Sequence, residues 1–138
     1  MARAIGALAI AGLFALGTDP PNAAQGSTIR FTNVSGATGL ASFLNISGTP
    51  SKDFIVESIG NGVALFDYDN DRDLDVLFVN GSTLTKATAH PMVGLYRNDG
   101  DRFTDVTAAT GLTRPGWGSG VCVADYDNDG FEDVYVTA

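Results

Sequence analysis

The sequence has few of the residues from which zinc and nucleophilic catalytic sites are built. Its 138 residues include one cysteine and one histidine, so an internal disulfide is excluded and a zinc site of several Cys and His ligands is not available. Cys122 lies in the apolar run 121–124 and is predicted to be a small core residue. His90 precedes Pro91 in a polar stretch and is predicted to be a loop residue.

Basic residues are also scarce. Lys and Arg number 8 against 16 Asp and Glu, giving a net charge of −8, which argues against nucleic acid or an anionic membrane as the partner. With 44% hydrophobic and 17% charged residues, most of the chain is expected to fold. The acidic residues gather in two short segments, and ten of the sixteen are Asp67, Asp69, Asp71, Asp73, Asp75, Asp125, Asp127, Asp129, Glu132 and Asp133.

The N-terminal segment has the pattern of a secretory leader. Arg3 precedes an apolar stretch, 5–16, which is too short to span a bilayer comfortably. We therefore predict a signal peptide over residues 1–25, with no membrane span in the mature chain. Cleavage after Gly17 and cleavage near Ala23 and Ala24, before Gln25, both remain open. The protein is expected to be exported to the periplasm, the cell surface or the medium.

Two internal repeats organise the rest of the chain. A shift of 58 residues places 63–78 onto 121–136, with an identical Asp-Tyr-Asp-Asn-Asp core, and a shift of 72 places 31–40 onto 103–112. The two shifts differ by 14 residues, so the first copy carries an insertion. The segment 41–52, rich in Ser and Gly, is the expected insertion and is predicted to be a surface loop.

Short β-prone runs predict an all-β fold. Strands are expected at 63–66, 76–79, 93–97, 102–106, 121–124 and 134–136, with a tight turn at 98–100. Because several runs are continuously apolar, we expect strands covered on both faces. A unit of about four short strands has the size of a propeller blade. Residues 26–138 are therefore predicted to form a partial β-propeller of about two four-stranded blades, as the N-terminal piece of a longer protein.

Alternate aspartates in the two acidic segments predict calcium sites. Two carboxylates about 4 Å apart repel by about 1 kcal/mol in water and by more when partly desolvated, so each loop needs a cation. Several carboxylates in a flexible loop without His or Cys favour Ca2+ over zinc, copper and magnesium. Side chains at positions 1, 3, 5 and 9 and the carbonyl at position 7 can surround one ion. The predicted ligands are Asp67, Asp69, Asp71, the Asp73 carbonyl and Asp75 in the first loop, and Asp125, Asp127, Asp129, the Phe131 carbonyl and Asp133 in the second.

The two loops differ at position 6, where a sharp turn favours glycine. Gly130 occupies this position in the second loop and Arg72 in the first, and a non-glycine residue at positive φ costs roughly 1 kcal/mol. The first loop is therefore expected to be strained, differently shaped or weaker for calcium. An EF-hand is disfavoured because position 12 is Phe78 or Val136 instead of Glu. Solvated acidic turns without a metal remain the alternative to calcium sites.

The segment 118–136, with Asp125-Tyr-Asp-Asn-Asp-Gly130 inside it, resembles the FG-GAP or VCBS repeat of integrin α-subunit propellers. The segments 95–100, 103–106 and 111–112 resemble bacterial proteins related to cartilage acidic protein, which often carry a UnbV/ASPIC region. The resemblance implies a seven- or eight-bladed propeller with calcium in a loop joining two strands of a blade. It also implies that 31–40 is an outer strand of a blade.

Together these features predict an exported calcium-binding module for adhesion or for protein or glycan recognition, with structural calcium and no enzyme activity. The alternative is the N-terminal part of a calcium-containing propeller enzyme, of polysaccharide lyase or phospholipase type, with its active site in other blades. No Gly-x-Ser-x-Gly elbow supports that alternative, and the dense carboxylate clusters are already assigned to the metal loops. Exposed sheet edges are expected to favour self-association.

Overall fold

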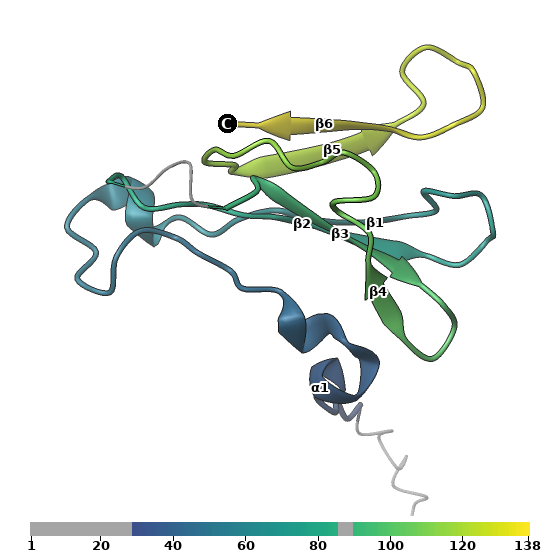
Figure 1. Cartoon of the computed structure of the whole chain (residues 1–138), viewed down its shortest axis with the longest axis horizontal. Coiled ribbons are helices and arrows are strands. Elements are labelled where there is room, and N and C mark those ends of the chain that lie inside the picture. Colours follow the sequence, from purple (N-terminus) through teal and green to yellow (C-terminus); the bar gives the residue numbers. More distant parts are fainter. Residues whose placement is uncertain (1–28, 86–89) are drawn as a thin grey trace, which may run out of the picture. The chain divides into compact units, whose positions relative to one another are not determined.

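The computed structural model describes residues 29–85 and 90–138 (Figure 1). The predicted signal peptide over residues 1–25 lies outside these described residues. Among the described residues, helical structure is confined to α1 (Ser35–Thr38) and the 3-10 turns η1 (Leu40–Ser42) and η2 (Ile55–Ser58). None of the helices in this part of the chain has the length and apolar character needed to cross a membrane.

The described strands form a four-stranded antiparallel sheet of order β1-β2-β3-β4 and a separate antiparallel hairpin of β5 and β6. Their bounds are β1 Val63–Phe66, β2 Asp75–Val79, β3 Val93–Asn98, β4 Phe103–Asp105, β5 Gly120–Ala124 and β6 Asp133–Thr137. The predicted all-β class is confirmed, and every strand expected between residues 63 and 136 is present. The sheet order follows the sequence because short connections join antiparallel neighbours.

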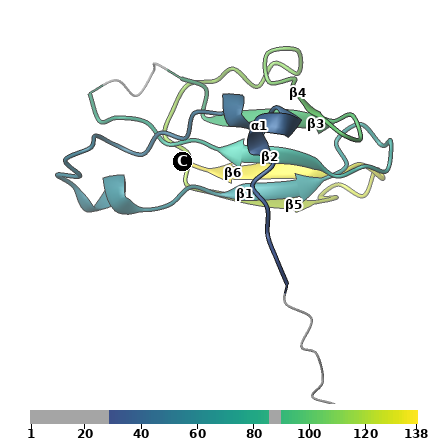
Figure 2. The same ribbon diagram turned by 90° about the horizontal axis from the view of Figure 1, so that it is seen from below.

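Side chains alternate between two faces of the four-stranded sheet, as strand geometry requires. Face A carries Ala64, Phe66, Leu77, Val79, Val93 and Leu95, and face B carries Val63, Leu65, Val76, Phe78, Gly94 and Tyr96. Face A forms the core. The β5–β6 hairpin lies along this face as a second layer (Figures 1 and 2) and packs Val121, Val123 and Val136 against it.

Face B is covered in part by the inserted segment. The Phe43 ring stacks on Phe78 with centroids 4.5 Å apart and meets Tyr96 edge-on at 6.2 Å. This close approach favours glycine at position 94, because a Cβ there would lie 3.0 Å from the Phe43 ring, which is tighter than an ordinary contact. The insertion is a loop, as predicted, but it is anchored to the sheet by a stacked aromatic ring.

A buried carboxylate fixes the far end of the insertion. Glu57 is buried, and its two carboxylate oxygens accept hydrogen bonds from the backbone N–H groups of Thr49 and Phe54, at 3.0 and 3.1 Å. The buried Asn80 side chain accepts a further hydrogen bond from the Ile46 N–H at 2.8 Å. These contacts satisfy backbone donors that the loop cannot pair internally.

The expectation of strands covered on both faces is correct for β2 and β3 and wrong for β1, β5 and β6. On β1, Val63 is 59% and Leu65 62% exposed. The prediction of a buried Cys122 is also wrong, because the thiol is exposed. Cys122 alternates with Val121 and Val123, and these two valines take the side of β5 that meets the sheet. A run of apolar residues does not reveal whether a second layer lies on each side.

The segment 31–40 is not the outer strand that the family resemblance implied. Residues 32–34 are without a strand partner among the described residues, and α1 follows them. The repeat is nevertheless real. Thr38 and Thr110 each donate the backbone N–H to the carbonyl four residues earlier, at 3.0 Å in both copies. The next residue is Gly39 or Gly111, with φ of 91° or 76°, a conformation that favours glycine.

Candidate metal centres

Each aspartate loop connects the two strands of a hairpin. Residues 67–74 join β1 to β2, and residues 125–132 join β5 to β6. Both loops lie at the same end of the stacked layers, on the right in Figures 1 and 2. The repeated sequence therefore places two similar acidic loops along one rim.

The first aspartate of each loop folds the backbone around itself. The Asp67 carboxylate accepts hydrogen bonds from the backbone N–H groups four and five positions later, at 3.0 and 2.9 Å. Asp125 makes the equivalent bonds at 3.1 and 3.0 Å. Because both oxygens of each carboxylate are engaged in this way, position 1 sets the shape of the loop as well as offering ligand atoms.

The two loops share one backbone conformation despite their difference at position 6. Position 4 is left-handed in both, with φ of 62° at Asn70 and 60° at Asn128. Position 6 is also left-handed, with φ of 78° at Arg72 and 91° at Gly130. Of the outcomes expected for the first loop, the structure shows strain without a change of shape. Asparagine adopts this region readily, whereas arginine costs roughly 1–2 kcal/mol there.

Three carboxylates converge in each loop. One oxygen from each member of a triad lies within 4.8 Å of the others, and the triads are Asp67, Asp69 and Asp71 in the first loop and Asp125, Asp127 and Asp133 in the second. Calcium binds oxygen at about 2.3–2.6 Å, so ligands on opposite sides of one ion lie about 5 Å apart. Both triads fit around a single calcium ion, and their all-oxygen chemistry matches its preference.

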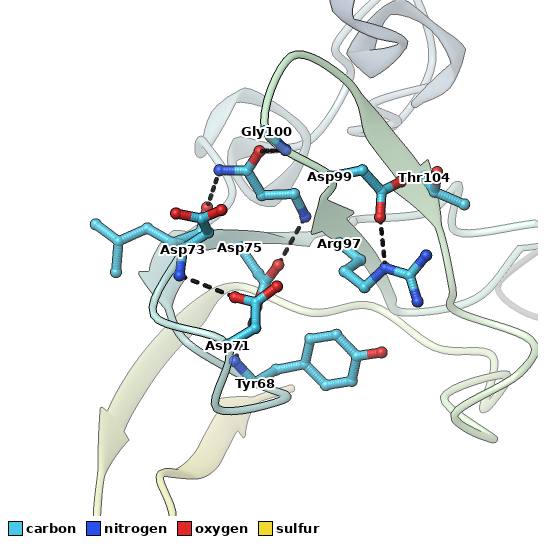
Figure 3. A network of polar contacts seen from close by, with 10 residues as sticks. Tyr68, Asp71, Asp73, Asp75, Arg97, Asp99, Gly100 and Thr104 are labelled. Atoms are coloured by element: carbon cyan, nitrogen blue, oxygen red, sulfur yellow. Dashed lines mark hydrogen bonds and ion pairs between the residues drawn. The ribbon is translucent and has the colours of Figure 1, made fainter.

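The predicted ligands at position 9 differ in environment. The Asp75 carboxylate is fully buried, with 0% exposure, and accepts hydrogen bonds from the backbone N–H groups of Tyr68 and Asn98 at 2.9 and 2.7 Å (Figure 3). Asp133 is exposed. It accepts a hydrogen bond from the Tyr126 N–H at 2.8 Å, which is equivalent to the bond between Tyr68 and Asp75. The difference arises because β3 lies beside β2, whereas β6 has β5 as its only neighbour in the described part of the chain.

Four predicted ligands lie outside the two triads, namely Asp73, Asp75, Asp129 and Phe131. Asp129 binds the loop backbone, accepting the Phe131 N–H at 2.9 Å, and Asp71 accepts the Asp73 N–H in the same way at 2.8 Å. The side chains of Asp73 and Phe131 are exposed, and both residues were predicted to act through their carbonyls. The assignment of these four residues as ligands stays a prediction.

Crowding of the carboxylates is visible in the electrostatics of position 3. The pKa of Asp69 is raised, first by desolvation and then by the neighbouring charges of Asp71, Asp75 and Asp67. Both causes disfavour the ionised form when no cation is near. A divalent cation among these oxygens would offset the negative charge of the neighbouring carboxylates and favour the ionised form of Asp69. The first loop is therefore electrostatically suited to a cation.

Sequence reasoning missed the part of the site supplied by the β3–β4 hairpin. The Asn98 side chain donates to the Leu74 carbonyl at 3.1 Å and accepts the Gly100 N–H at 3.0 Å, so it ties the metal loop to the next turn. Beside it, Asp99 pairs with Arg97 at 2.8 Å and accepts the Thr104 hydroxyl hydrogen bond at 2.6 Å (Figure 3). The sequence identified residues 98–100 only as a turn. No periodic signal links Asn98 to a loop more than twenty positions away.

Comparison with known families agrees with this geometry. The profile of the FG-GAP-like repeat matches residues 67–136, a span that runs from the first aspartate loop to β6 and includes both triads. No curated protein and no solved structure gives a match to the chain.

Proposed function

The chain belongs to the family of FG-GAP-like repeats, and from this premise we propose that it is an exported, non-catalytic β-propeller-type module with one structural Ca2+ in each aspartate loop. The observation that carries the proposal is the convergence of three carboxylates in each loop. When bound, calcium would supply the positive charge that offsets their mutual repulsion. The narrower resemblance to proteins with a UnbV/ASPIC region stays a prediction.

The protein's own residues have separate tasks in this proposal. Asp67 and Asp125 shape the two loops through their backbone hydrogen bonds. The other two members of each triad complete the set of ligand oxygens. Asp75 fastens the first loop to β3, so ion binding there would stabilise a loop that is already joined to the sheet. Filling such sites stabilises the folded chain by mass action.

Recognition of a protein or glycan partner is proposed for the end of the strands opposite the metal loops. The connections at that end differ between the two copies, since the first copy has the 14-residue insertion that includes residues 41–52. Loops that vary on a fixed scaffold are the usual carriers of binding specificity. Export is supported by the leader-like residues 1–25 and by the abundance of calcium outside cells, where weak sites are filled.

The test of the calcium sites is thermal unfolding of the full chain with calcium, with magnesium and with chelator. We expect calcium to raise Tm, and Asp67→Ala and Asp125→Ala each to remove part of that increase. Asp101→Ala, which changes an exposed aspartate outside both loops, is the matched control and keeps the full response. An unchanged Tm on adding calcium would overturn the proposal. A response abolished by Asp125→Ala alone would show that Arg72 disables the first loop.

Export has its own test. Residues 1–25 fused to a reporter are expected to direct it out of the cytoplasm, and N-terminal sequencing of the mature product separates cleavage after Gly17 from cleavage near Ala24. Retention of the fusion in the cytoplasm contradicts export without affecting the calcium sites.

A further inference from the structure

A cavity of about 510 Å3 lies over face B of the four-stranded sheet, and sites for small ligands usually have about 300–1,000 Å3. Three parts of the chain line it: the inserted segment around Phe43, the face-B residues of β3, and the turn that follows β4. The cavity extends from Tyr96 to Asn80 and Pro91, which lie at the end of the strands opposite the metal loops. It therefore reaches the region for which partner recognition is proposed.

A buried amide offers this cavity a hydrogen-bond donor. Asn80 is only 5% exposed, and its Oδ1 accepts the Ile46 N–H at 2.8 Å, whereas its Nδ2 has no hydrogen-bond partner among the described residues. In the same part of the chain, no fully buried side-chain nitrogen or oxygen lacks a partner. The Nδ2 atom therefore reaches the surface of the cavity that Asn80 lines. An otherwise buried donor in this position is suited to an acceptor on a ligand.

Oxygen atoms of two paired residues lie in the same cavity. Tyr96 and Asp105 are partners across β3 and β4, so their side chains project from the same face of the sheet. The Tyr96 hydroxyl shares a hydrogen bond of 3.2 Å with Ser42 Oγ. Asp105 accepts the Thr107 N–H through Oδ1 at 3.0 Å, and its Oδ2 has no partner in the part of the chain that the structure describes. The cavity thus contains a free acceptor as well as the donor of Asn80.

Apolar side chains form much of the remaining lining. The Phe43 ring is held in place by Phe78 and Tyr96, with centroids 4.5 and 6.2 Å away, and Leu44 and Pro91 also line the cavity. Among the described residues that line it there is no Lys or Arg, so the lining does not favour an anion. The matching ligand is uncharged, has an apolar side, and carries groups that both donate and accept hydrogen bonds.

We propose that this cavity binds a neutral hexose unit of a glycan, an inference that deepens the proposed recognition role and rests on it. The hydroxyl groups of a pyranose ring both donate and accept hydrogen bonds, and its C–H groups pack on aromatic and aliphatic side chains. An extended peptide fits less well, because β3 beneath the cavity is paired with β2 and β4 and offers no free strand edge. An acidic sugar is disfavoured by the carboxylate of Asp105.

Titration calorimetry of the full chain with the methyl glycosides of glucose, galactose and mannose tests this proposal. At least one of the three sugars is expected to bind, and N-acetylneuraminic acid is not. Asp105→Asn is expected to weaken sugar binding about tenfold, because it removes the charge from one hydrogen bond and keeps the acceptor for the Thr107 N–H. Asp101→Asn, at an exposed aspartate outside the cavity, is the matched control and keeps wild-type affinity. Failure of all three sugars to bind overturns the proposal.

Ala108→Tyr is a second variant that acts by filling the cavity. Ala108 is exposed and lines the cavity, so this change is expected to abolish sugar binding and leave the fold intact, which circular dichroism checks. Sugar binding that keeps wild-type affinity in both Asp105→Asn and Ala108→Tyr would place recognition elsewhere on the chain and overturn the cavity assignment. Binding of lysine amide instead of the sugars would show that Asp105 receives a basic peptide side chain, which overturns the glycan.

The calcium response of Tm, measured on the same preparations, separates this inference from the metal sites. It is expected to be unchanged in Asp105→Asn and Ala108→Tyr, because neither residue belongs to an aspartate loop. A chain that responds to calcium and binds none of the sugars contradicts the hexose site and leaves the calcium sites standing.

Discussion

The carboxylate of Asp75 accepts the backbone N–H of Asn98 at 2.7 Å, across 23 positions of sequence. Its other oxygen accepts the Tyr68 N–H from the start of the aspartate loop. One buried side chain therefore joins the loop to the middle of the sheet. A residue predicted only as a metal ligand also has a structural role that needs no ion.

Replacing Asp75 tests this structural role. Asp75→Ala leaves the N–H groups of Tyr68 and Asn98 without their acceptor, and an unsatisfied buried donor costs about 1–3 kcal/mol. We expect the free energy of unfolding, measured with denaturant in the presence of chelator, to fall by about 2–4 kcal/mol. Asp73→Ala changes an exposed side chain in the same loop and is expected to stay within about 0.5 kcal/mol of wild type. Equal effects of the two substitutions would show that the hydrogen bonds of Asp75 add little.

Arg72 holds a left-handed conformation that glycine adopts without strain. In saturating calcium, Arg72→Gly is expected to be more stable than Arg72→Gln by about 1 kcal/mol, because both remove the charge and only glycine removes the Cβ. Gly130→Gln in the second loop should lose a similar amount. Chemical denaturation of the three variants provides the measurement. Equal stability of Arg72→Gly and Arg72→Gln would mean that the loop relaxes around the side chain.

Gly60 and Gly118 are equivalent positions of the two copies, and they are predicted to differ in their tolerance of a methyl group. Gly118→Ala places a Cβ against Val79 and Met92, and overpacking of this kind typically costs about 1–3 kcal/mol. Gly60→Ala meets no neighbour and is expected to be neutral, or to gain up to about 0.5 kcal/mol from the stiffer unfolded chain. Thermal unfolding in dilute solution, where association is negligible, distinguishes the two. Similar Tm changes would contradict the packing of the hairpin on the sheet.

Asp99 predicts a pH dependence in the β3–β4 turn. The Thr104 hydroxyl and then the Arg97 guanidinium lower the pKa of Asp99 below its ordinary value of 3.8. A carboxyl group with a lowered pKa stabilises the fold above its unfolded pKa, and this contribution is lost as pH falls through the folded pKa. Asp99→Asn should therefore reduce stability at pH 7, and this difference should shrink as pH falls below 3.8. Asp101→Asn, in the same turn, is the control, and a destabilisation by Asp99→Asn that persists unchanged at low pH would exclude the charge as its cause.

Local features of the fold were well predicted from the sequence. Strand positions follow from β-prone runs, and the two aspartate loops follow from alternate acidic residues, because both patterns are properties of short segments. The left-handed backbone at Arg72 was anticipated as a cost, since the same position holds Gly130 in the other copy. The internal repeat supplied this comparison within a single chain.

Features that depend on what lies beside a segment were not predictable in this way. The burial of Asp75 against β3 and the exposure of Asp133 arise from the number of neighbouring strands, which the repeated loop sequence does not encode. Exposure of Cys122 has the same cause, because an apolar run predicts burial without stating which side is covered. The helix at 35–38 replaced an implied strand where the chain provides no pairing partner among the described residues.

Val121, Val123 and Val136 pack on face A of the sheet, whereas their equivalents in the first copy, Val63, Leu65 and Phe78, lie on face B. The two layers therefore meet through unlike faces. Each repeat that is added to such a stack packs its face B on the face A of the previous repeat and exposes its own face A. The stack therefore has a direction, and nothing in this contact limits the number of repeats. Growth ends only when curvature brings the final face A round to the first face B. The number of units in a closed ring would then be set by the small rotation between neighbouring sheets and not by the chemistry of the aspartate loops.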